Sequence, residues 1–358
     1  MLLRDFDEEP GMRPTTTPAP SANPQMSDMS STRPADPQPS HRLSLENIHH
    51  ASTIVDPVFL DSPQYDCEPL SELLGCELTL KLEHLNPIRS FKGRGASYLM
   101  QVRASAGDDR PIVGATAGNW GQALAYVCRA AGRPITIYAA LNANPLKIER
   151  MRAMGAEVKL EGDDFDAAKA AARAFADGAG ANFLEDGREA AVSEGHGTIA
   201  IELLARGATY DDVLIPLGNG ALLTGIGRWM KAASPSTRLV GVCARGARAM
   251  YDSWHQHAPV SRDTADTIAD GIAIRIPVPE AVQDMNGTVD EVLLVDDDDI
   301  VAAMRRLLQH AGQLVEPSGA AGVAAVSTHR ERFQGRRVAS VLCGSNMTEE
   351  QLNAYGLL

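Results

Sequence analysis

The sequence predicts an α/β fold with largely parallel sheets, and three observations support this prediction. Strand-like and helix-like segments alternate along most of the chain, which is the pattern of βαβ units. Several predicted strands are followed by small, glycine-containing loops that open a helix. The chain has 358 residues, of which 44% are apolar, so it can form one large domain or two with a sizeable core. We expect two domains, each an open, mainly parallel sheet flanked by helices.

The individual elements are predicted from apolar runs and from residues that begin or end helices. Short apolar runs bounded by turn residues are typical of buried strands, and longer periodic stretches between them are typical of helices. Asn144 is expected to cap a helix with Pro145 at its first position, and Gly155 is expected to end it. The predicted strands are 111–116, 135–140, 156–162, 212–218, 238–244 and 336–344. The predicted helices are 119–132, 145–154, 164–178 and 222–233.

The first 42 residues differ in composition from the rest. They are rich in Pro, Ser, Thr and Asp and have almost no apolar periodicity. Such a segment buries too little apolar surface to offset the conformational entropy lost on folding. We therefore expect a disordered tail over 1–42, and it lacks the basic start and apolar core of a signal peptide. Residues 105–188 are expected to form a small domain, and residues 43–104 together with 189–358 a large one.

Composition and charge exclude several classes of partner. The chain has 33 Lys and Arg against 46 Asp and Glu, and its net charge of −13 argues against nucleic acid or an anionic membrane surface. No apolar run approaches the roughly 20 residues of a membrane-spanning helix. Five cysteines without a close CxxC pair fit a reducing compartment, so we expect a cytoplasmic protein. The pairs His49-His50 and His255-x-His257 lack an evident third ligand, so no metal is expected there.

One lysine has unusual neighbours in the stretch "SFKGRGA", residues 90–96. Surface lysines usually stand among polar residues, whereas Lys92 lies between a serine, a phenylalanine and glycines. Such surroundings partly desolvate an ammonium group and favour the uncharged amine, which a nucleophilic or Schiff-base lysine requires. On this stretch alone, an ordinary surface lysine remains the alternative.

Three small loops follow predicted strands, and in a parallel sheet ligands bind beyond the carboxyl ends of the strands. Residues 117–121 offer backbone N–H groups and the Asn119 amide to a carboxylate, although an ordinary strand–helix turn also explains them. Residues 218–221 suit a single phosphate at a helix N-terminus, because neither nucleotide-binding glycine pattern is present. Residues 343–346 form the third loop. Together with a sheltered lysine, these loops point to pyridoxal phosphate, which combines a Schiff base with a phosphate.

Seven motifs, in this order, resemble those of the fold-type II pyridoxal-phosphate enzymes of the tryptophan synthase β-like superfamily. The resemblance covers about residues 65–347 and is greatest to the serine/threonine dehydratase branch, which also contains serine racemase. The motifs are "KLEHLNPIRSFKGRGA" (81–96), "ATAGNWGQALA" (115–125), "GHGTIAIELL" (195–204), "LIPLGNGALLTG" (214–225), "TIADGIA" (267–273), "EPSGAAGVAA" (316–325) and "LCGSN" (342–346).

The resemblance implies roles for individual residues. Lys92 matches the Schiff-base lysine, which is also the acid and base at the substrate α-carbon, and Phe91 matches the residue beside the cofactor ring. Asn119 matches the partner of the cofactor 3′-oxygen, and Cys343 stands where relatives usually have a serine bonded to the pyridine nitrogen. The implied phosphate cradle is Gly218, Asn219, Gly220, Ala221 and Leu222. The implied loop for the substrate carboxylate is Thr116, Ala117, Gly118, Asn119 and Trp120. The cradle belongs to the large domain and the carboxylate loop to the small one.

The chain departs from the family pattern at several of these positions. The phosphate loop usually has four glycines, and here Asn219 and Ala221 replace two of them. A thiol at Cys343 hydrogen-bonds more weakly than a hydroxyl and would leave the pyridine nitrogen unprotonated, which favours elimination. Ala117 replaces the serine that serves the opposite face of the substrate in the racemase, which disfavours racemisation. The racemase's cation ligands would fall at 244–250, where the chain reads "ARGARAM", so no metal is expected.

The resemblance implies α,β-elimination of a β-hydroxy amino acid, such as threonine or serine, to a 2-oxo acid and ammonia. Family members are commonly dimers, so a homodimer that acts on a small amino acid is expected. The alternatives are a β-replacement enzyme of the cysteine synthase type and a non-catalytic binding protein that retains the fold. Arg89 stands where relatives usually carry the glycine of Thr-Gly-Ser, and one hypothesis places it near the substrate, where it would favour an acidic side chain.

Overall fold

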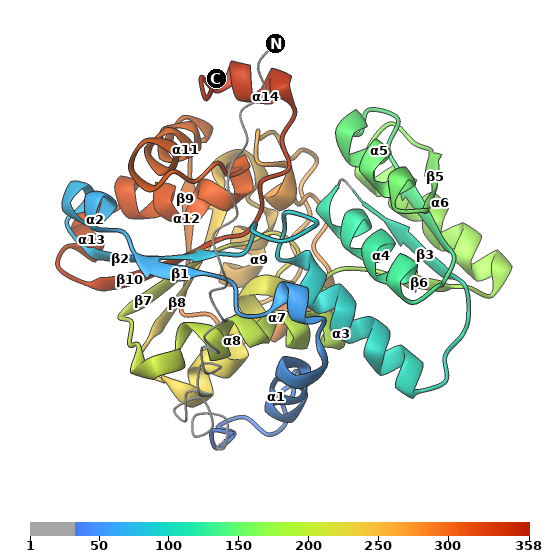
Figure 1. Ribbon diagram of the computed structural model, residues 1–358, viewed down its shortest axis with the longest axis horizontal. Helices are drawn as coiled ribbons and strands as arrows, with labels where there is room; N and C mark the ends of the chain where they lie inside the picture. The colour runs from blue at the N-terminus through green and yellow to red at the C-terminus, as the bar shows by residue number, and fades with distance from the viewer. Residues whose placement is uncertain (1–32, 117) are drawn as a thin grey trace, which may run out of the picture. The chain divides into compact units, whose positions relative to one another are not determined.

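The computed structural model describes residues 33–116 and 118–358, and in this part the chain forms two sheets flanked by helices (Figure 1). The predicted fold class is therefore confirmed. Residues 1–32 and Ala117 lie outside the described residues. The boundaries of the predicted domains stay a prediction.

The larger sheet has six strands in the order β1-β2-β10-β7-β8-β9. All neighbouring pairs are parallel except β1 and β2, which are antiparallel. Strand β7 is buried at every position, as expected for a parallel strand that is covered on both faces. The bounds are β1 Gln64–Asp66, β2 Glu77–Leu82, β7 Asp212–Pro216, β8 Arg238–Ala244, β9 Glu291–Val295 and β10 Arg337–Leu342.

The smaller sheet has four parallel strands in the order β5-β4-β3-β6. The bounds are β3 Ile112–Ala115, β4 Ile135–Ala139, β5 Glu157–Leu160 and β6 Asn182–Leu184. All four strands lie between β2 and β7 in the sequence, so the chain leaves the larger sheet once and returns to it once. The four strands of the smaller sheet are therefore contiguous in the sequence.

Helices cover both faces of both sheets, and four apolar clusters form between them. Helices α2, α11 and α12 pack on one face of the larger sheet, and α1, α7, α8 and α9 on the other. In the smaller sheet, α3, α4 and α5 contribute to one cluster and α6 to the other. The helices are α1 Leu45–Ile54, α2 Glu68–Leu74, α3 Lys92–Ser105, α4 Asn119–Ala130, α5 Pro145–Ala153, α6 Phe165–Ala179, α7 Ala190–Leu203, α8 Ala221–Ala233, α9 Ala249–Gln256, α10 Pro279–Asp284, α11 Asp297–Ala311, α12 Pro317–Thr328, α13 Arg330–Phe333 and α14 Glu349–Ala354.

All of the predicted strands and helices are present, with ends that differ by a few residues. The predicted start of α5 is confirmed, because the Asn144 side chain accepts hydrogen bonds from the N–H groups of Leu146 and Lys147. Strands β1, β2, β6 and β9 were not predicted. Two of them, β1 and β6, have only three residues each, too few for a periodic pattern to appear in the sequence.

Residues that precede α1 contact the larger sheet's helices, which composition alone does not predict. The buried guanidinium of Arg228, on α8, donates to the carbonyl of Leu43 at 2.7 Å and to the carboxylate of Asp36 at 2.5 Å. Arg42 forms an ion pair with Asp284. These contacts tie the segment before α1 to α8 and to the end of α10.

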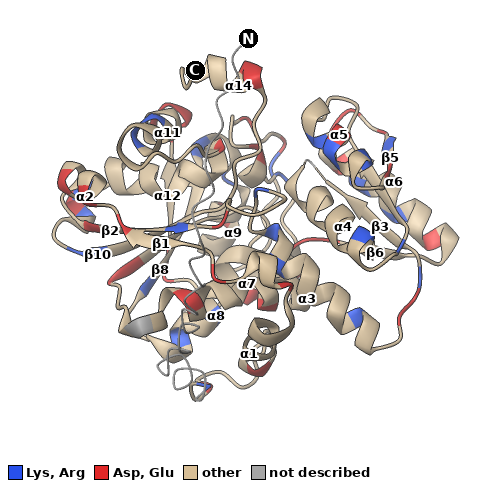
Figure 2. Cartoon of the chain, in the orientation of Figure 1, with Lys and Arg blue, Asp and Glu red and all other residues tan. Residues whose placement is uncertain are grey.

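The structure shows where the charged side chains and the cysteines of the described residues lie. Acidic and basic positions are interspersed over the helices and loops that the structure describes (Figure 2). Within residues 33–116 and 118–358, no helix is long and apolar enough to cross a membrane. All five cysteines are buried and free of disulfides.

Candidate functional site

A cavity of about 250 Å³ lies beyond the carboxyl ends of strands from both sheets. Every described residue that the sequence assigns to the site lines it: Phe91, Lys92, Thr116, Gly118, Asn119, Trp120, Gly218, Asn219, Gly220, Ala221, Leu222 and Cys343. Segments that are distant in the sequence therefore meet at one place. Ala117, the remaining predicted residue, lies outside the described residues.

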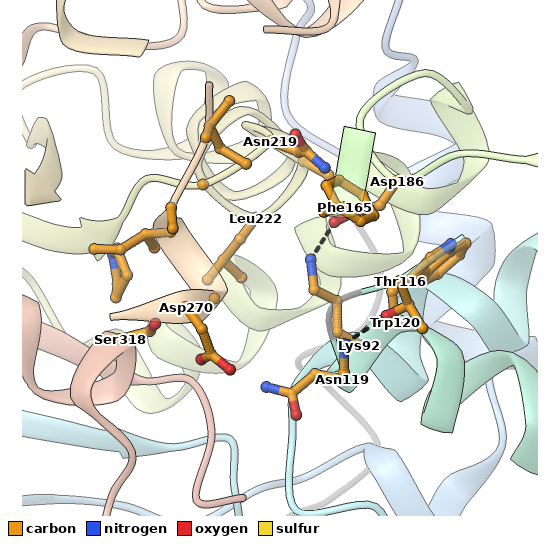
Figure 3. A pocket seen from close by; sticks show the side chains of 18 of the residues that line it. Lys92, Thr116, Asn119, Trp120, Phe165, Asp186, Asn219, Leu222, Asp270 and Ser318 are labelled. Carbon is orange, nitrogen blue, oxygen red and sulfur yellow. Dashed lines mark hydrogen bonds and ion pairs between the residues drawn. The ribbon is translucent and has the colours of Figure 1, made fainter. Parts of the chain in front are cut away.

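Lys92 is the first residue of α3 and reaches into the cavity (Figure 3). Its ammonium group lies 4.5 Å from the centre of the Phe91 ring and forms an ion pair with Asp186. The apolar and small neighbours expected from "SFKGRGA" are present, but the carboxylate opposite Lys92 was missed. Asp186 lies two residues after the end of the short strand β6, which the sequence does not predict.

A buried ionic network fixes the start of α3. Arg94 is completely buried and donates to Glu83 at 2.8 Å through both Nε and Nη2, and to Glu202 at 2.8 Å through Nη2. Lys81 forms a second ion pair with Glu202. Burial opposes the charge on Arg94, but the two carboxylates outweigh it and raise the pKa of the guanidinium. The backbone that carries Lys92 is thus held by charges from β2 and α7.

The loop before α4 is closed by Thr116, whose side-chain oxygen accepts hydrogen bonds from the N–H groups of Gly118 and Gly121 at 2.8 and 3.1 Å. A Cβ atom at Gly118 would lie 2.2 Å from Cδ of Lys147, so a larger residue there would have to displace the Lys147 side chain. Lys147 forms an ion pair with Asp270, which also lines the cavity. The loop opens a helix of 12 residues, whose N-terminus favours a bound carboxylate.

Two side chains fix the orientation of the Asn119 amide. Its Nδ2 donates to Oε1 of Glu316 at 2.6 Å, and its Oδ1 accepts from Nδ2 of Asn346 at 2.9 Å. With the amide assigned by this network, one Nδ2 hydrogen has no acceptor among the described residues and is available to a bound molecule. Burial raises the pKa of Glu316, and Asp270 adds to the effect, against the opposing charge of Lys147.

The loop at residues 218–222 can hold an anion. Gly220 has φ of +91°, a left-handed conformation that favours glycine, and the 13-residue helix α8 begins at Ala221. A Cβ atom at Gly218 would lie 2.7 Å from the carbonyl oxygen of Gly271, so the loop also packs closely on the "TIADGIA" segment. Free N–H groups and the positive end of the helix dipole favour a phosphate at this place.

Two small polar side chains lie on another part of the cavity wall. Burial raises the pKa of the Cys343 thiol, and the nearby Glu316 carboxylate raises it further, so Cys343 is a neutral thiol. The hydroxyl of Ser318 is buried and has no hydrogen-bond partner among the described residues. Either group can meet a weakly polar atom of a bound molecule.

The hypothesis that Arg89 lies near the substrate stays a prediction. Arg89 is exposed and is not among the residues that line the cavity, and this position does not support the hypothesis. It has φ of +52°, in the left-handed region where a residue with a Cβ atom is strained. Its carbonyl oxygen accepts a hydrogen bond from the N–H of Ser345 at 3.0 Å, which joins it to the loop after β10.

The segment at 244–250, where a cation site was judged absent, holds ion pairs between side chains. Arg245 pairs with Asp296 at 2.7 Å, and Arg248 pairs with Asp252 at 2.9 Å. Among the residues that the structure describes, no three His, Cys, Asp or Glu side chains gather as metal ligands would. The absence of a metal stays a prediction.

Sequence reasoning missed the charged side chains that surround the predicted residues. Glu316 and Asp270 stand in two of the quoted motifs, "EPSGAAGVAA" and "TIADGIA", and could have been singled out as the only carboxylates in them. Lys147 lies on the buried side of α5, two residues after Pro145, and no local pattern points to it. These residues carry three of the charges that face the cavity.

The family model and the relatives that match this chain point to the same family of enzymes. A family model described as "Pyridoxal-phosphate dependent enzyme" matches residues 55–344. The chain is 31% identical over 288 residues to a biosynthetic L-threonine dehydratase of Pasteurella multocida, a match over 80% of this chain and 56% of that protein. It is 32% identical over 305 residues to an L-threonine ammonia-lyase of Thermotoga maritima, which covers 85% of this chain and 76% of that one. The chain thus spans little more than half the length of the Pasteurella enzyme.

Solved structures show the same fold. Threonine deaminase isoform 2 of Solanum lycopersicum has a TM-score of 0.81 at 28% identity, with 87% of this chain and 91% of that chain covered. A pyridoxal 5'-phosphate-dependent aspartate racemase has a TM-score of 0.82 at 26% identity, with 88% and 99% covered. The proteins similar to this chain thus include threonine dehydratases and deaminases and also a racemase.

Proposed function

The chain belongs to the family of pyridoxal-phosphate dependent enzymes, and from this premise we propose that it catalyses α,β-elimination of a β-hydroxy amino acid. The products would be a 2-oxo acid and ammonia, with threonine or serine as the model substrates. The similarity to threonine dehydratases at about 30% identity supports this reaction class. The substrate itself is part of the proposal, because a racemase is also similar.

The observation that carries the proposal is the meeting of Lys92, Asn119 and the 218–222 loop in one cavity. These groups fit the cofactor: an amine for the Schiff base, an amide with one free hydrogen for the 3′-oxygen, and a helix N-terminus for the phosphate. Cys343 would face the pyridine nitrogen as a neutral thiol, and Phe91 would pack beside the ring. When bound, the cofactor supplies the electron withdrawal that makes the substrate α-proton removable.

The chain's own residues would bind the substrate and move protons. The loop from Thr116 to Trp120 would hold the α-carboxylate at the N-terminus of α4, as its closed geometry allows. Lys92 would remove the α-proton with its free amine, and the ionic network around Arg94 would keep that nitrogen in position. Position 117 is an alanine where the resembled racemase has a serine, and an alanine side chain has no proton to donate, which supports elimination over racemisation.

The test is a panel of amino acids with the purified protein and pyridoxal phosphate. We expect release of 2-oxo acid from L-threonine or L-serine, and loss of this release in the Lys92→Ala variant. Sulfide-dependent formation of cysteine from O-acetylserine, without 2-oxo acid from threonine, would instead identify a β-replacement enzyme. A protein that stays colourless with added cofactor would be a binding protein that has kept only the fold.

The oligomeric state, the binding partners and the cellular compartment of the protein are also proposed. We propose a cytoplasmic homodimer that acts on a small amino acid and binds neither nucleic acid nor membrane. The buried free cysteines and the negative net charge support these assignments.

A further inference from the structure

Asp186 is a charged residue of the site that has no role in the proposed function and lies against Lys92. Its side chain is 7% exposed, it lines the cavity, and it forms an ion pair with Lys92. The second carboxylate oxygen, Oδ1, is buried and has no hydrogen-bond partner among the described residues. A buried carboxylate with a free oxygen is costly unless a donor arrives, so this atom indicates a contact that a ligand completes.

The position of Asp186 is fixed by its backbone. Gly187 has φ of +89°, and a Cβ atom there would lie 2.6 Å from the carbonyl oxygen of Asn219, so the segment packs tightly on the 218–222 loop. Arg42 donates to the carbonyl of Arg188 at 2.6 Å on the other side. In Figure 3, Lys92 extends toward Asp186 and away from the side chain of Asn119. The carboxylate is therefore held where the reactive nitrogen lies.

The neighbouring acid has a different environment. Glu185 pairs with Lys169 at 3.2 Å and with Arg173 at 2.8 Å, so its charge is compensated by residues of α6. Lys92 is the one cation that pairs with Asp186 among residues 33–116 and 118–358. When the Lys92 nitrogen is bonded to the cofactor as an imine, it carries at most one proton, and an incoming amino acid brings a further positive charge to this place.

We propose that Asp186 accepts a proton from the ammonium group of the incoming amino acid. An ammonium nitrogen has no lone pair, so it must lose a proton before it can replace Lys92 on the cofactor. The proton moves to a carboxylate oxygen of Asp186; the amino nitrogen then bonds to the carbon that Lys92 gives up, and the bond from that carbon to the lysine nitrogen breaks. The transferred proton stays on Asp186, so the released Lys92 nitrogen is the free amine that removes the α-proton. In the proposed elimination this proton leaves in the water formed from the β-hydroxyl.

The inference rests on the proposed function only in that Lys92 carries the cofactor, and its test needs no elimination. The protein loaded with pyridoxal phosphate is mixed with L-alanine, D-alanine or glycine, which have no β-leaving group, and the exchange is followed by the absorbance change of the cofactor. A parallel series uses methoxyamine, an amine that is uncharged at neutral pH and needs no proton acceptor. The variants are Asp186→Asn, which removes the acceptor, Asp186→Glu, which keeps it, and Glu189→Gln, a nearby carboxylate outside the cavity, as control.

We expect Asp186→Asn to slow exchange with the amino acids by about 100-fold or more and to leave the methoxyamine rate unchanged. Asp186→Glu should recover part of the amino-acid rate, and Glu189→Gln should match the wild type in both series. Equal slowing with both kinds of amine would show a structural role and overturn the proposal. So would an unaltered amino-acid rate, a wild type that exchanges none of the amino acids, or variants that no longer take up the cofactor. A wild type that exchanges alanine but releases no 2-oxo acid would refute the proposed elimination alone.

Discussion

Glu316 accepts a hydrogen bond of 2.6 Å from the side chain of Asn119, and this contact joins the residue before α12 to the first residue of α4. Glu316 belongs to the part of the chain that forms the larger sheet, and Asn119 follows the loop after β3 of the smaller sheet. The same carboxylate accepts from the N–H of Asn346 at 2.8 Å. Glu316 therefore orients the amide proposed to meet the cofactor without itself having to touch it.

The pKa of Glu316 gives a prediction about stability and pH. Burial raises this pKa in the folded protein, so on a rise in pH the unfolded chain loses the proton first. The folded state is then penalised from the unfolded value near 4.5 up to the raised folded value, and stability falls across that window. We expect Glu316→Gln to remove this contribution, so that its free energy of unfolding improves relative to the wild type as pH rises. Urea unfolding of both cofactor-free proteins at several pH values measures it, and a difference that does not change with pH would contradict it.

The Arg94 network gives a prediction about the cost of an unpaired buried charge. Arg94→Met would leave the carboxylates of Glu83 and Glu202 without their shared cation, and we expect a loss of about 3–5 kcal/mol in the free energy of unfolding. The exposed pair of Arg33 and Glu46 is the control, since Arg33→Met should cost less than about 1 kcal/mol. Both values come from chemical denaturation. Similar small losses for the two variants would show that the network is not an anchor of α3.

Arg89 gives a prediction about backbone strain. Because it has φ of +52°, Arg89→Gly should stabilise the protein by about 1 kcal/mol, whereas Arg89→Ala, which keeps a Cβ atom, should not. Since Arg89 lies outside the cavity, the preference among serine, threonine and hydroxyaspartate should not change. Thermal unfolding and the substrate panel check the two parts separately. A changed substrate preference would contradict this prediction and show that Arg89 influences substrate binding.

Gly118 gives a prediction about the loop before α4. A Cβ atom there would displace the Lys147 side chain, so Gly118→Ala should disturb the ion pair with Asp270 and weaken substrate binding more than cofactor binding. The matched control is Gly178 in α6, where a Cβ atom meets nothing within 4 Å. Gly178→Ala should be neutral or stabilise the protein by up to about 1 kcal/mol. Spectroscopic titrations with cofactor and with an amino acid measure the two affinities.

Much of the site could be predicted because of one rule about parallel sheets. Loops after strands converge at one edge, so Asn119, the 218–222 loop and Cys343 were found from strands whose apolar runs are long enough to recognise. Lys92 was found from its unusual neighbours and from the motif around it. The fold class followed from the alternation of elements, which does not depend on where each element ends.

The missed residues lacked a local signal. Asp186 follows a strand of three residues, and its importance comes from Lys92, which is 94 positions away in the sequence. Lys147 and Asp270 meet only through tertiary structure, 123 positions apart. The hypothesis for Arg89 rests on its closeness to Lys92 in the sequence, and a residue within a motif need not line the cavity that its neighbours line. Pairings of this kind depend on how the two sheets approach each other, which periodicity does not encode.

The path of the chain between the sheets has a mechanical consequence for the ion pair of Lys92 and Asp186. Two covalent links join the strands of the smaller sheet to those of the larger: the outgoing link contains α3, which begins at Lys92, and the return link begins just before Asp186. If the smaller sheet swings, atoms beside both links are near the pivot and travel least. Ion pairs that cross between the sheets without such a link, such as Lys147 with Asp270 and Arg275 with Asp166, would separate first. The Lys92 nitrogen and the Asp186 carboxylate would thus keep their relative position while the cavity opened to admit substrate and release product.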